Sequence, residues 1–225
     1  HVILEKVEQY GLRVFSPGIE AAHLVAVPSG TMTVNAEWSM GEVYFAGEEK
    51  EGLMTFAAQM FCTAAVRHQM IQIHSSLISY QDQGIMFLGP SSIGKTTQAE
   101  LWNRYRDAMI INGDIVFVQE TSDGFLGWGT PWHGSSPYCE NTSVPVAAMV
   151  VLKQAKKNAI RELTGFEKVR EVSGSVFYPQ WLEGGMELCF TTLDHLLKKI
   201  PVYELSCRPD EDAVRLTEQV VFHVK

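Results

Sequence analysis

A short segment near the middle of the chain has the residue types and the spacing of a phosphate-binding loop. From Gly89 to Thr96 the sequence matches G-x-x-x-x-G-K-T without a mismatch. Its two glycines let the backbone turn tightly and bring N–H groups close to an anion. Lys95 can reach the terminal phosphates of a nucleotide, and the Thr96 hydroxyl can ligate Mg²⁺. The segment therefore predicts a site for a nucleotide and Mg²⁺.

The sequence on either side of this loop has the order that a P-loop needs, which is strand, loop and helix. Ile85 to Leu88 is an apolar run short enough for a buried strand, and residues 98–106 are typical of a helix. A lysine in the first helical turn opposes the helix dipole, so a bound anion would account for it. The alternative is a helix-start glycine followed by a solvated lysine. The predicted nucleotide-binding residues are Gly89, Pro90, Ser91, Ser92, Ile93, Gly94, Lys95, Thr96 and Thr97.

One carboxylate, Asp114, lies within the apolar stretch from Ala108 to Val118. Burying a carboxylate is costly unless it is paired or holds a metal. We interpret Asp114 as a residue at a strand end that faces Mg²⁺ or a substrate hydroxyl. The alternative is a turn residue that follows Gly113. Thr96 and Asp114 are therefore the predicted metal ligands.

Two further segments carry polar residues in less specific patterns. Residues 130–138 combine aromatic side chains, hydroxyls and His133 in a turn-rich loop, for which function and surface packing both stay open. The strand predicted over 144–153 is expected to return over 159–163 as a basic hairpin. A solvated hairpin is favoured over a lid that offers Lys153 or Arg161 to a phosphate.

The elements that must position these residues indicate an α/β fold. Residues 1–50 contain β-type runs that predict a small antiparallel layer, and residues 51–225 are predicted to form the core. A turn near Asp82 should join a strand over 72–79 to the strand before the loop as a hairpin. In the helix predicted over 52–70, an apolar stripe that includes Leu53 and Phe61 is expected to face the core. The remaining runs predict N-terminal strands over 12–15, 23–27, 31–35 and 43–45, strands over 124–130 and 201–207, and helices over 165–182, 186–199 and from Asp210 onward.

Composition limits the possible partners. The chain has 225 residues, of which 46% are hydrophobic and 20% charged, which is enough apolar material for a proper core. Its net charge of −8 and the lack of a large basic cluster disfavour a nucleic-acid partner. No apolar run is long enough to cross a membrane. The four scattered cysteines are typical of reduced thiols, so we expect a cytoplasmic protein; a homo-oligomeric state is left open.

The chain resembles the HPr kinase/phosphorylase and phosphoenolpyruvate carboxykinase superfamily, and within it the short HPr-kinase-like members. The resemblance lies in the segment from His74 through the hairpin to Thr96, and in Asn112-Gly113-Asp114, where the family has paired aspartates. It implies a mixed, partly antiparallel sheet with a P-loop. It also implies that Asp114, His74 and Lys95 are catalytic, with Asp114 as the base for the acceptor hydroxyl and His74 beside the phosphates as a polar or proton-handling group. Taken alone, His74 would be interpreted as a hydrogen-bonded histidine of the strand.

The resemblance and the motif together predict ATP- and Mg²⁺-dependent phosphoryl transfer to a hydroxyl of a protein, a peptide or a small metabolite. Three features depart from the family pattern: Thr96 and Thr97 replace Ser and Glu, Gly113 replaces the first aspartate, and the second signature is missing. HPr is therefore not the expected substrate, and the extra residues needed for decarboxylation are absent. A nucleotide-binding regulatory module and an NTP hydrolase remain the alternatives.

Overall fold

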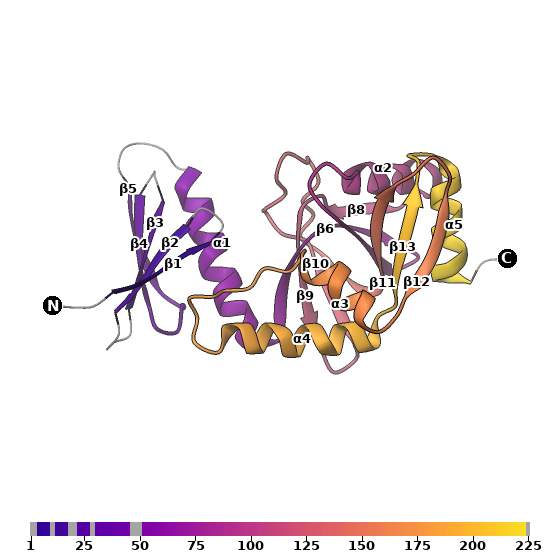
Figure 1. Ribbon diagram of the computed structural model, residues 1–225. Coiled ribbons are helices and arrows are strands. Elements are labelled where there is room, and N and C mark those ends of the chain that lie inside the picture. The colour runs from indigo at the N-terminus through magenta and orange to yellow at the C-terminus, as the bar shows by residue number, and fades with distance from the viewer. Residues whose placement is uncertain (1–3, 10–11, 18–21, 28–29, 46–50, 224–225) are drawn as a thin grey trace. The chain divides into compact units, whose positions relative to one another are not determined.

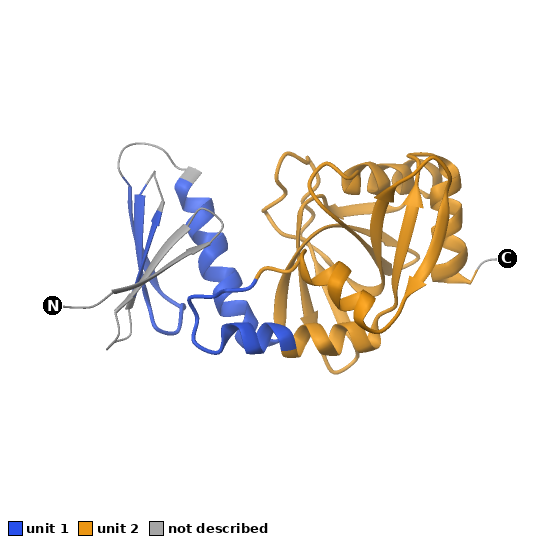
Figure 2. Ribbon diagram, viewed as in Figure 1, with its two compact units in different colours: residues 1–69, 178–190 blue, residues 70–177, 191–225 orange. Residues whose placement is uncertain are grey.

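A computed structural model describes residues 4–9, 12–17, 22–27, 30–45 and 51–223 of the chain (Figure 1). The chain divides into two compact units, the first made of residues 1–69 and 178–190 and the second of residues 70–177 and 191–225 (Figure 2). The boundary predicted after residue 50 falls beside residues 46–50, which lie outside the described residues.

The first unit contains an antiparallel sheet of five strands in sequential order. The predicted antiparallel layer is therefore confirmed, but its first strand was not predicted. That strand reads Leu-Glu-Lys-Val-Glu-Gln and has no clean alternation of apolar and polar residues, so its pairing with the next strand decides its conformation. The strands are β1 (Leu4–Gln9), β2 (Leu12–Pro17), β3 (Ala22–Val27), β4 (Gly30–Asn35) and β5 (Gly41–Phe45).

A helix, α1 (Glu51–Ala65), and a 3₁₀ turn, η1 (Val66–His68), complete the N-terminal part of this unit. The prediction that Leu53 and Phe61 face the core is wrong, since they are 48% and 47% exposed. Two other residues of the predicted stripe, Phe56 and Ala65, are buried as expected, and the polar Gln59 and Thr63 are buried with them. Apolar residues occur all round this helix, so periodicity alone could not select its buried face.

The second unit is built on a mixed sheet of eight strands, which confirms the predicted mixed α/β class. Three adjacent strands, β7, β11 and β13, run parallel, and the other pairings are antiparallel. Strand β10 pairs with both β9 and β11, so five strands close into a ring. The strands are β6 (Met70–Tyr80), β7 (Gln83–Leu88), β8 (Met109–Asn112), β9 (Ile115–Glu120), β10 (Phe125–Trp128), β11 (Ser143–Gln154), β12 (Ala159–Leu163) and β13 (Val202–Cys207).

The hairpin predicted before the glycine-rich loop is present. Strands β6 and β7 pair antiparallel, and Gln81 and Asp82 form the turn, both at positive φ. This geometry suits a two-residue hairpin turn, because its backbone twist matches that of the flanking strands.

The basic hairpin predicted over residues 144–163 is wrong. Strand β13 lies between β11 and β12, parallel to the first and antiparallel to the second. The sequence between β11 and β12 is short and polar, like a hairpin loop, but the apolar β13 takes the central position. The order of a sheet depends on pairing over long sequence separations, which local patterns do not encode.

Four helices complete the second unit, and one differs from its predicted extent. Helix α3 (Phe166–Ser173) ends at Gly174 instead of continuing to residue 182, because glycine is a poor helix former and Pro179 follows. Helix α5 (Glu211–Phe222) begins as predicted with Asp210 as N-cap, whose carboxylate accepts from the Ala213 N–H. The other two are α2 (Lys95–Arg106) and α4 (Gly185–Lys199), whose first residues belong to the first unit.

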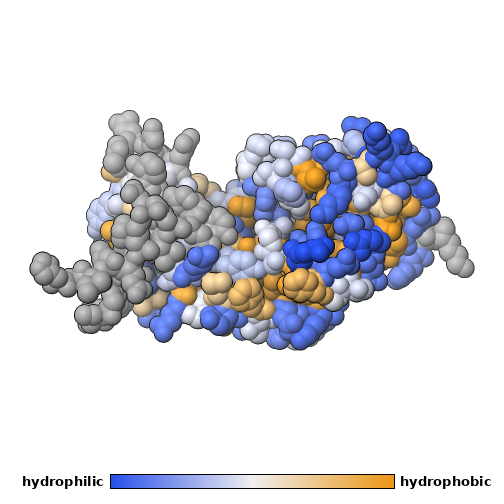
Figure 3. Space-filling model, viewed as in Figure 1, coloured by the Kyte–Doolittle hydropathy of each residue, from blue (hydrophilic) through white to orange (hydrophobic). Residues whose placement is uncertain are grey.

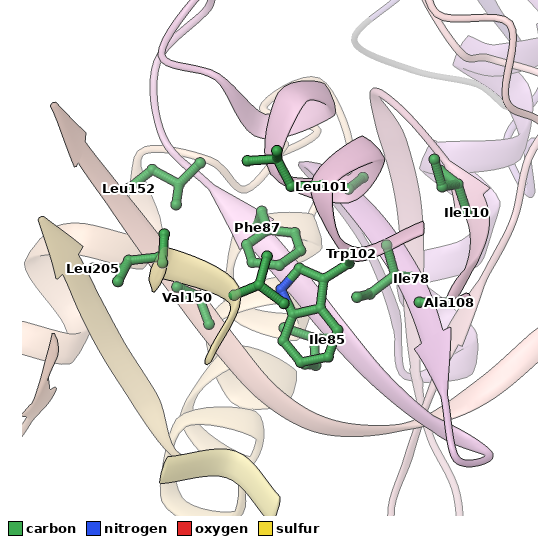
Figure 4. Packing of buried hydrophobic residues seen from close by; sticks show 13 residues of the cluster. Ile78, Ile85, Phe87, Leu101, Trp102, Ala108, Ile110, Val150, Leu152 and Leu205 are labelled. Atoms are coloured by element: carbon green, nitrogen blue, oxygen red, sulfur yellow. The ribbon is translucent and has the colours of Figure 1, made fainter. Parts of the chain in front are cut away.

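One apolar cluster fixes α2 and α5 against the sheet (Figure 4). Trp102 of α2 is fully buried and lies among residues of β6, β7, β11 and β13, including Ile78, Phe87 and Leu205. The indole also contacts Tyr80 and Phe222 edge-on or tilted. Truncation of such a buried Trp typically costs roughly 3–5 kcal/mol, so this residue contributes strongly to holding α2 against the sheet.

No helix in the described part of the chain is both long and apolar enough to span a membrane. On the face shown in Figure 3, hydrophilic residues predominate over the second unit, with smaller hydrophobic areas between them.

Candidate functional site

The loop between β7 and α2, residues 89–94 and here called the glycine loop, has an unusual backbone. Gly89 and Gly94 adopt φ of 139° and 113°, and Ser92 adopts φ of 65°. Glycine takes such angles without steric cost, whereas other residues rarely do. Helix α2 begins directly after Gly94, and no side chain caps its N-terminus. The first N–H groups of α2 and its positive dipole end are therefore available to an anion.

Lys95 is the first residue of α2 and is largely buried. Its ammonium donates to the carbonyl oxygens of Gly89 at 3.0 Å and Pro90 at 3.2 Å. Burial lowers the pKa of Lys95, and the nearby Asp114 carboxylate partly opposes this shift. The lysine is thus a poorly hydrated cation held inside the glycine loop.

Strand β6 is hydrogen-bonded to the first residue of α2. The Ser76 hydroxyl, which is fully buried, donates to the Lys95 carbonyl oxygen at 3.0 Å. Two residues earlier on the same strand, His74 has its Nε2 2.9 Å from Oδ1 of Asp114. Since alternate residues of a strand face the same side, β6 directs both Ser76 and His74 at this region.

The partnership with His74 sets the charge of Asp114. The hydrogen bond from His74 lowers the pKa of the Asp114 carboxyl, burial opposes the shift, and the charges of His74, Lys95 and His133 lower the pKa further. Asp114 is therefore a carboxylate at neutral pH, and its side chain is about one third exposed.

A buried amide, Asn112, positions Asp114. Its Oδ1 accepts from the backbone N–H groups of Asp114 at 2.8 Å and Ile115 at 3.0 Å, which fixes the turn between β8 and β9. Its Nδ2 donates to the Thr130 carbonyl oxygen at 2.9 Å. Asp114 is therefore a turn residue, as the alternative interpretation of the sequence proposed, and it also belongs to this cluster.

The loop that follows β10 brings residues that the sequence analysis did not assign to the site. His133 Nδ1 contacts the Ser136 carbonyl oxygen, and the Ser136 N–H donates to the His133 carbonyl oxygen at 3.0 Å. A Cβ on Gly134 would lie 2.7 Å from Oδ2 of Asp114, so this loop packs directly against the carboxylate. The mixture of hydroxyls and a histidine between two strands was the available signal, but nothing in it specified the contact.

A cavity of about 350 Å³ in the second unit is lined by several of the residues described above. Of the predicted residues, His74 and Asp114 lie there together with Ser91, Ser92, Gly94, Lys95, Thr96 and Thr97. Gly89, Pro90 and Ile93 do not line it. The loop after β10 adds His133, Ser135 and Ser136.

The two basic residues considered as a lid have other partners. The Lys153 ammonium lies 2.7 Å from Glu171, and Arg161 pairs with Glu167 at 3.0 Å and Glu204 at 3.1 Å. Neither lines the cavity around Asp114, which favours the solvated alternative for Arg161.

The two residues predicted to bind Mg²⁺, Thr96 and Asp114, can be compared with the ligands that Mg²⁺ prefers. Thr96 Oγ1 donates to the Gly113 carbonyl oxygen at 3.3 Å, so the turn that carries Asp114 lies within reach of the Thr96 hydroxyl. Within the described residues no group of three or more His, Cys, Asp or Glu could hold a metal. Mg²⁺ commonly uses one carboxylate with substrate phosphates and water, so one hydroxyl and one carboxylate suit it.

Comparison with known proteins identifies no family for this chain. No protein-family model matches the chain, and no curated protein matches it. Among solved structures the chain is similar to the Hpr(Ser) kinase/phosphatase from Coxiella burnetii, with 10% sequence identity and a TM-score of 0.42. That match covers 68% of this chain and 88% of the other.

Proposed function

We propose that the protein is a phosphotransferase that moves the terminal phosphoryl group of Mg-ATP to a hydroxyl group of a peptide, a protein or a small metabolite. The observation that carries the proposal is the convergence of Lys95, Thr96, His74 and Asp114 on one cavity. A phosphate-binding loop, a cation and an ionised carboxylate are the parts that phosphoryl transfer requires.

In this proposal the glycine loop and the N-terminus of α2 bind the phosphates. Lys95 leaves its loop carbonyl partners to contact the phosphate oxygens, which accept its hydrogen bonds more strongly than neutral carbonyls do. Thr96 and Asp114 would hold Mg²⁺, which would supply positive charge to offset the negative charge that develops during transfer. Positioning and charge neutralisation would supply most of the rate.

Asp114 has a second role in the proposal, as acceptor of the proton of the attacking hydroxyl. Its pKa is lowered, which makes it a weak base but keeps it ionised and ready to orient a hydroxyl. His74 donates to the same carboxylate and keeps that carboxylate in one orientation. In the proposal, the two side chains share the proton that Asp114 accepts.

The test is a panel assay. The purified protein is incubated with Mg-ATP and a set of Ser-containing peptides and hydroxyl-bearing metabolites, and products are examined by mass spectrometry for a gain of phosphate. Transfer that Lys95→Ala and Asp114→Asn both abolish supports the proposal. ATP consumption that no acceptor alters favours a hydrolase, and ATP binding without consumption favours a regulatory module.

A further inference from the structure

Several residues that line the cavity around Asp114 carry hydroxyl groups, and one of them is placed to accept a phosphoryl group. We propose that Ser135 is a site of autophosphorylation, at which the serine hydroxyl takes the terminal phosphoryl group of ATP bound to the same protein molecule. This inference rests on the proposed function for the position of the phosphates and the role of Asp114. It goes beyond that function by naming an acceptor within the chain itself.

The hydroxyl groups of the cavity come from two parts of the chain. The glycine loop and the start of α2 contribute Ser91, Ser92, Thr96 and Thr97. In the proposed function these residues lie around the phosphates, and phosphoryl transfer needs the attacking oxygen roughly in line with the leaving oxygen. The acceptor hydroxyl must therefore come from another element. Among the described residues that line the cavity, Ser135 and Ser136 in the loop after β10 meet this condition.

The hydroxyl of Ser136 is already used in the packing of its loop. Ser136 is 8% exposed, and its Oγ accepts from the Tyr138 N–H at 3.3 Å. Its side chain also lies against Gly113, since a Cβ on that glycine would clash with it. Ser135 is exposed, and its hydroxyl has no hydrogen-bond partner within the described part of the chain. Ser135 can therefore take a phosphate without unpacking the loop, whereas Ser136 cannot.

The chain beside Ser135 contacts the candidate base. A Cβ on Gly134 would lie 2.7 Å from Oδ2 of Asp114, so Gly134 packs directly against the carboxylate. Consecutive Cα atoms are about 3.8 Å apart, so Ser135 follows that contact at once. His133 and Ser136 close the turn around these two residues through two contacts, one from the imidazole and one between backbone groups. Ser135 is therefore held in a closed turn that rests on Asp114.

The reaction uses groups that already line the cavity. Oγ of Ser135 attacks the terminal phosphorus of ATP, so that a P–O bond forms to the serine and the P–O bond to the bridging oxygen of the β-phosphate breaks. ADP leaves with the electron pair of the broken bond. The hydroxyl proton passes to the ionised Asp114 carboxylate and from there to water.

Donor and acceptor are held by one compact unit, which predicts the kinetics. The glycine loop, Asp114 and Ser135 all belong to the second unit. Transfer within one folded unit needs no encounter between two protein molecules, so it behaves as a unimolecular step. The initial rate per molecule should therefore not depend on the protein concentration.

The experiment measures phosphate on the protein itself. The full chain is treated with a phosphatase, separated from it, and incubated with Mg-ATP at several protein concentrations without an added acceptor. Intact-mass spectrometry should show the gain of one phosphoryl group, and fragmentation of the peptides should place that group on Ser135. Phosphate on another residue but not on Ser135, or a rate per molecule that rises with protein concentration, overturns the inference.

Variants distinguish an acceptor from a residue of the cavity wall. Ser135→Ala should lose the phosphate, and a variant that gains as much as the wild type overturns the inference. Ser135→Thr keeps a hydroxyl and should carry phosphothreonine at this position, which a merely structural role would not produce. The matched control is Ser122→Ala, because Ser122 is exposed in the turn between β9 and β10 and does not line this cavity. Its phosphate gain should equal that of the wild type.

A mixing experiment tests whether transfer stays within one molecule. Lys95→Ala, which lacks the lysine of the glycine loop, is incubated with the wild type and Mg-ATP. Only the wild type should gain phosphate. Phosphate on Ser135 of the Lys95→Ala protein overturns transfer within one molecule.

The outcomes separate this inference from the proposed function. Phosphate that reaches an added acceptor but not Ser135 overturns autophosphorylation and leaves the phosphotransferase in place. ATP that binds but modifies neither the protein nor any acceptor overturns both. Failure to bind ATP removes the donor, and it overturns the proposed function and the Ser135 site together.

Discussion

His74 and Asp114 face each other across two paired strands, with Nε2 of the histidine 2.9 Å from Oδ1 of the carboxylate. The register explains this contact, because β6 and β9 pair His74 with Ile115, the residue after Asp114. The backbone fixes it further, since the Ser75 N–H donates to the Asp114 carbonyl oxygen at 2.9 Å. The pair is therefore a property of the sheet and not of flexible side chains.

Asp114→Asn should reduce phosphoryl transfer by at least ~10²-fold, the usual scale for loss of a general base. Asparagine keeps the shape but removes the negative charge that would orient the hydroxyl and the metal. ATP affinity should fall only modestly, since the glycine loop and Lys95 are intact. Single-turnover kinetics with a phosphate acceptor, together with calorimetry, measure the two effects.

The matched control for that variant is Asp82→Asn. Asp82 lies exposed in the β6–β7 turn at φ of 58°, where asparagine is well tolerated, and it does not line the cavity around Asp114. The rate of phosphoryl transfer by Asp82→Asn should equal that of the wild type. A transfer rate near wild type for Asp114→Asn would leave Asp114 as a turn residue only.

Lys95→Ala should abolish measurable Mg-ATP binding, because Lys95 is the only cationic side chain in the run from Gly89 to Thr97. Calorimetry checks this, with circular dichroism to confirm that the variant is folded. Lys157→Ala removes an exposed lysine elsewhere in the second unit and should leave the affinity unchanged. ATP affinity that survives Lys95→Ala in a folded protein contradicts the assignment of the glycine loop.

Gly113→Ala should destabilise the protein by about 1–3 kcal/mol, the usual cost of overpacking, and should also lower transfer. A Cβ at this position would clash with Oγ and Cβ of Ser136, so the loop over Asp114 must move. Urea unfolding measures the loss of stability. Gly174→Ala is the control, because its Cβ meets nothing within 4 Å and its φ is −67°.

The same contact explains why residue 113 is a glycine. Here Ser136 occupies the space that a side chain at position 113 would need. A Gly113→Ala variant as stable as the wild type would mean that the loop rearranges freely, and this account would be wrong.

The contribution of Asp114 to the free energy of unfolding should decrease as the pH falls. Its folded pKa lies below the ordinary value of 3.8, so the unfolded chain binds the proton more readily. The contribution is therefore fully present above pH 3.8 and is lost as the pH falls through the folded pKa. Urea unfolding at a series of pH values gives the free energy of unfolding of the wild type and of Asp114→Asn. The difference between the two values is the contribution of Asp114. A difference that grows as the pH falls would contradict the lowered pKa.

The sequence by itself determined the elements whose signals are local. The four apolar residues before Gly89, the two glycines and the helical run after Thr97 predicted a strand, a loop and a helix, and the structure has them in that order. The turn at Asp82 and the N-cap at Asp210 were predictable for the same reason. Backbone preferences and short-range periodicity act within a few residues, so they can be read from adjacent positions.

Only the tertiary structure decided which of these elements become neighbours. The insertion of β13 between β11 and β12, the contact of His74 with Asp114 and the approach of Ser136 to Gly113 all join residues far apart in the chain. Helix α1 shows the same limit, because its apolar residues lie on several faces and burial of one face was settled by packing. Such pairings depend on the free energy of burying whole surfaces together, which no single stretch of sequence contains.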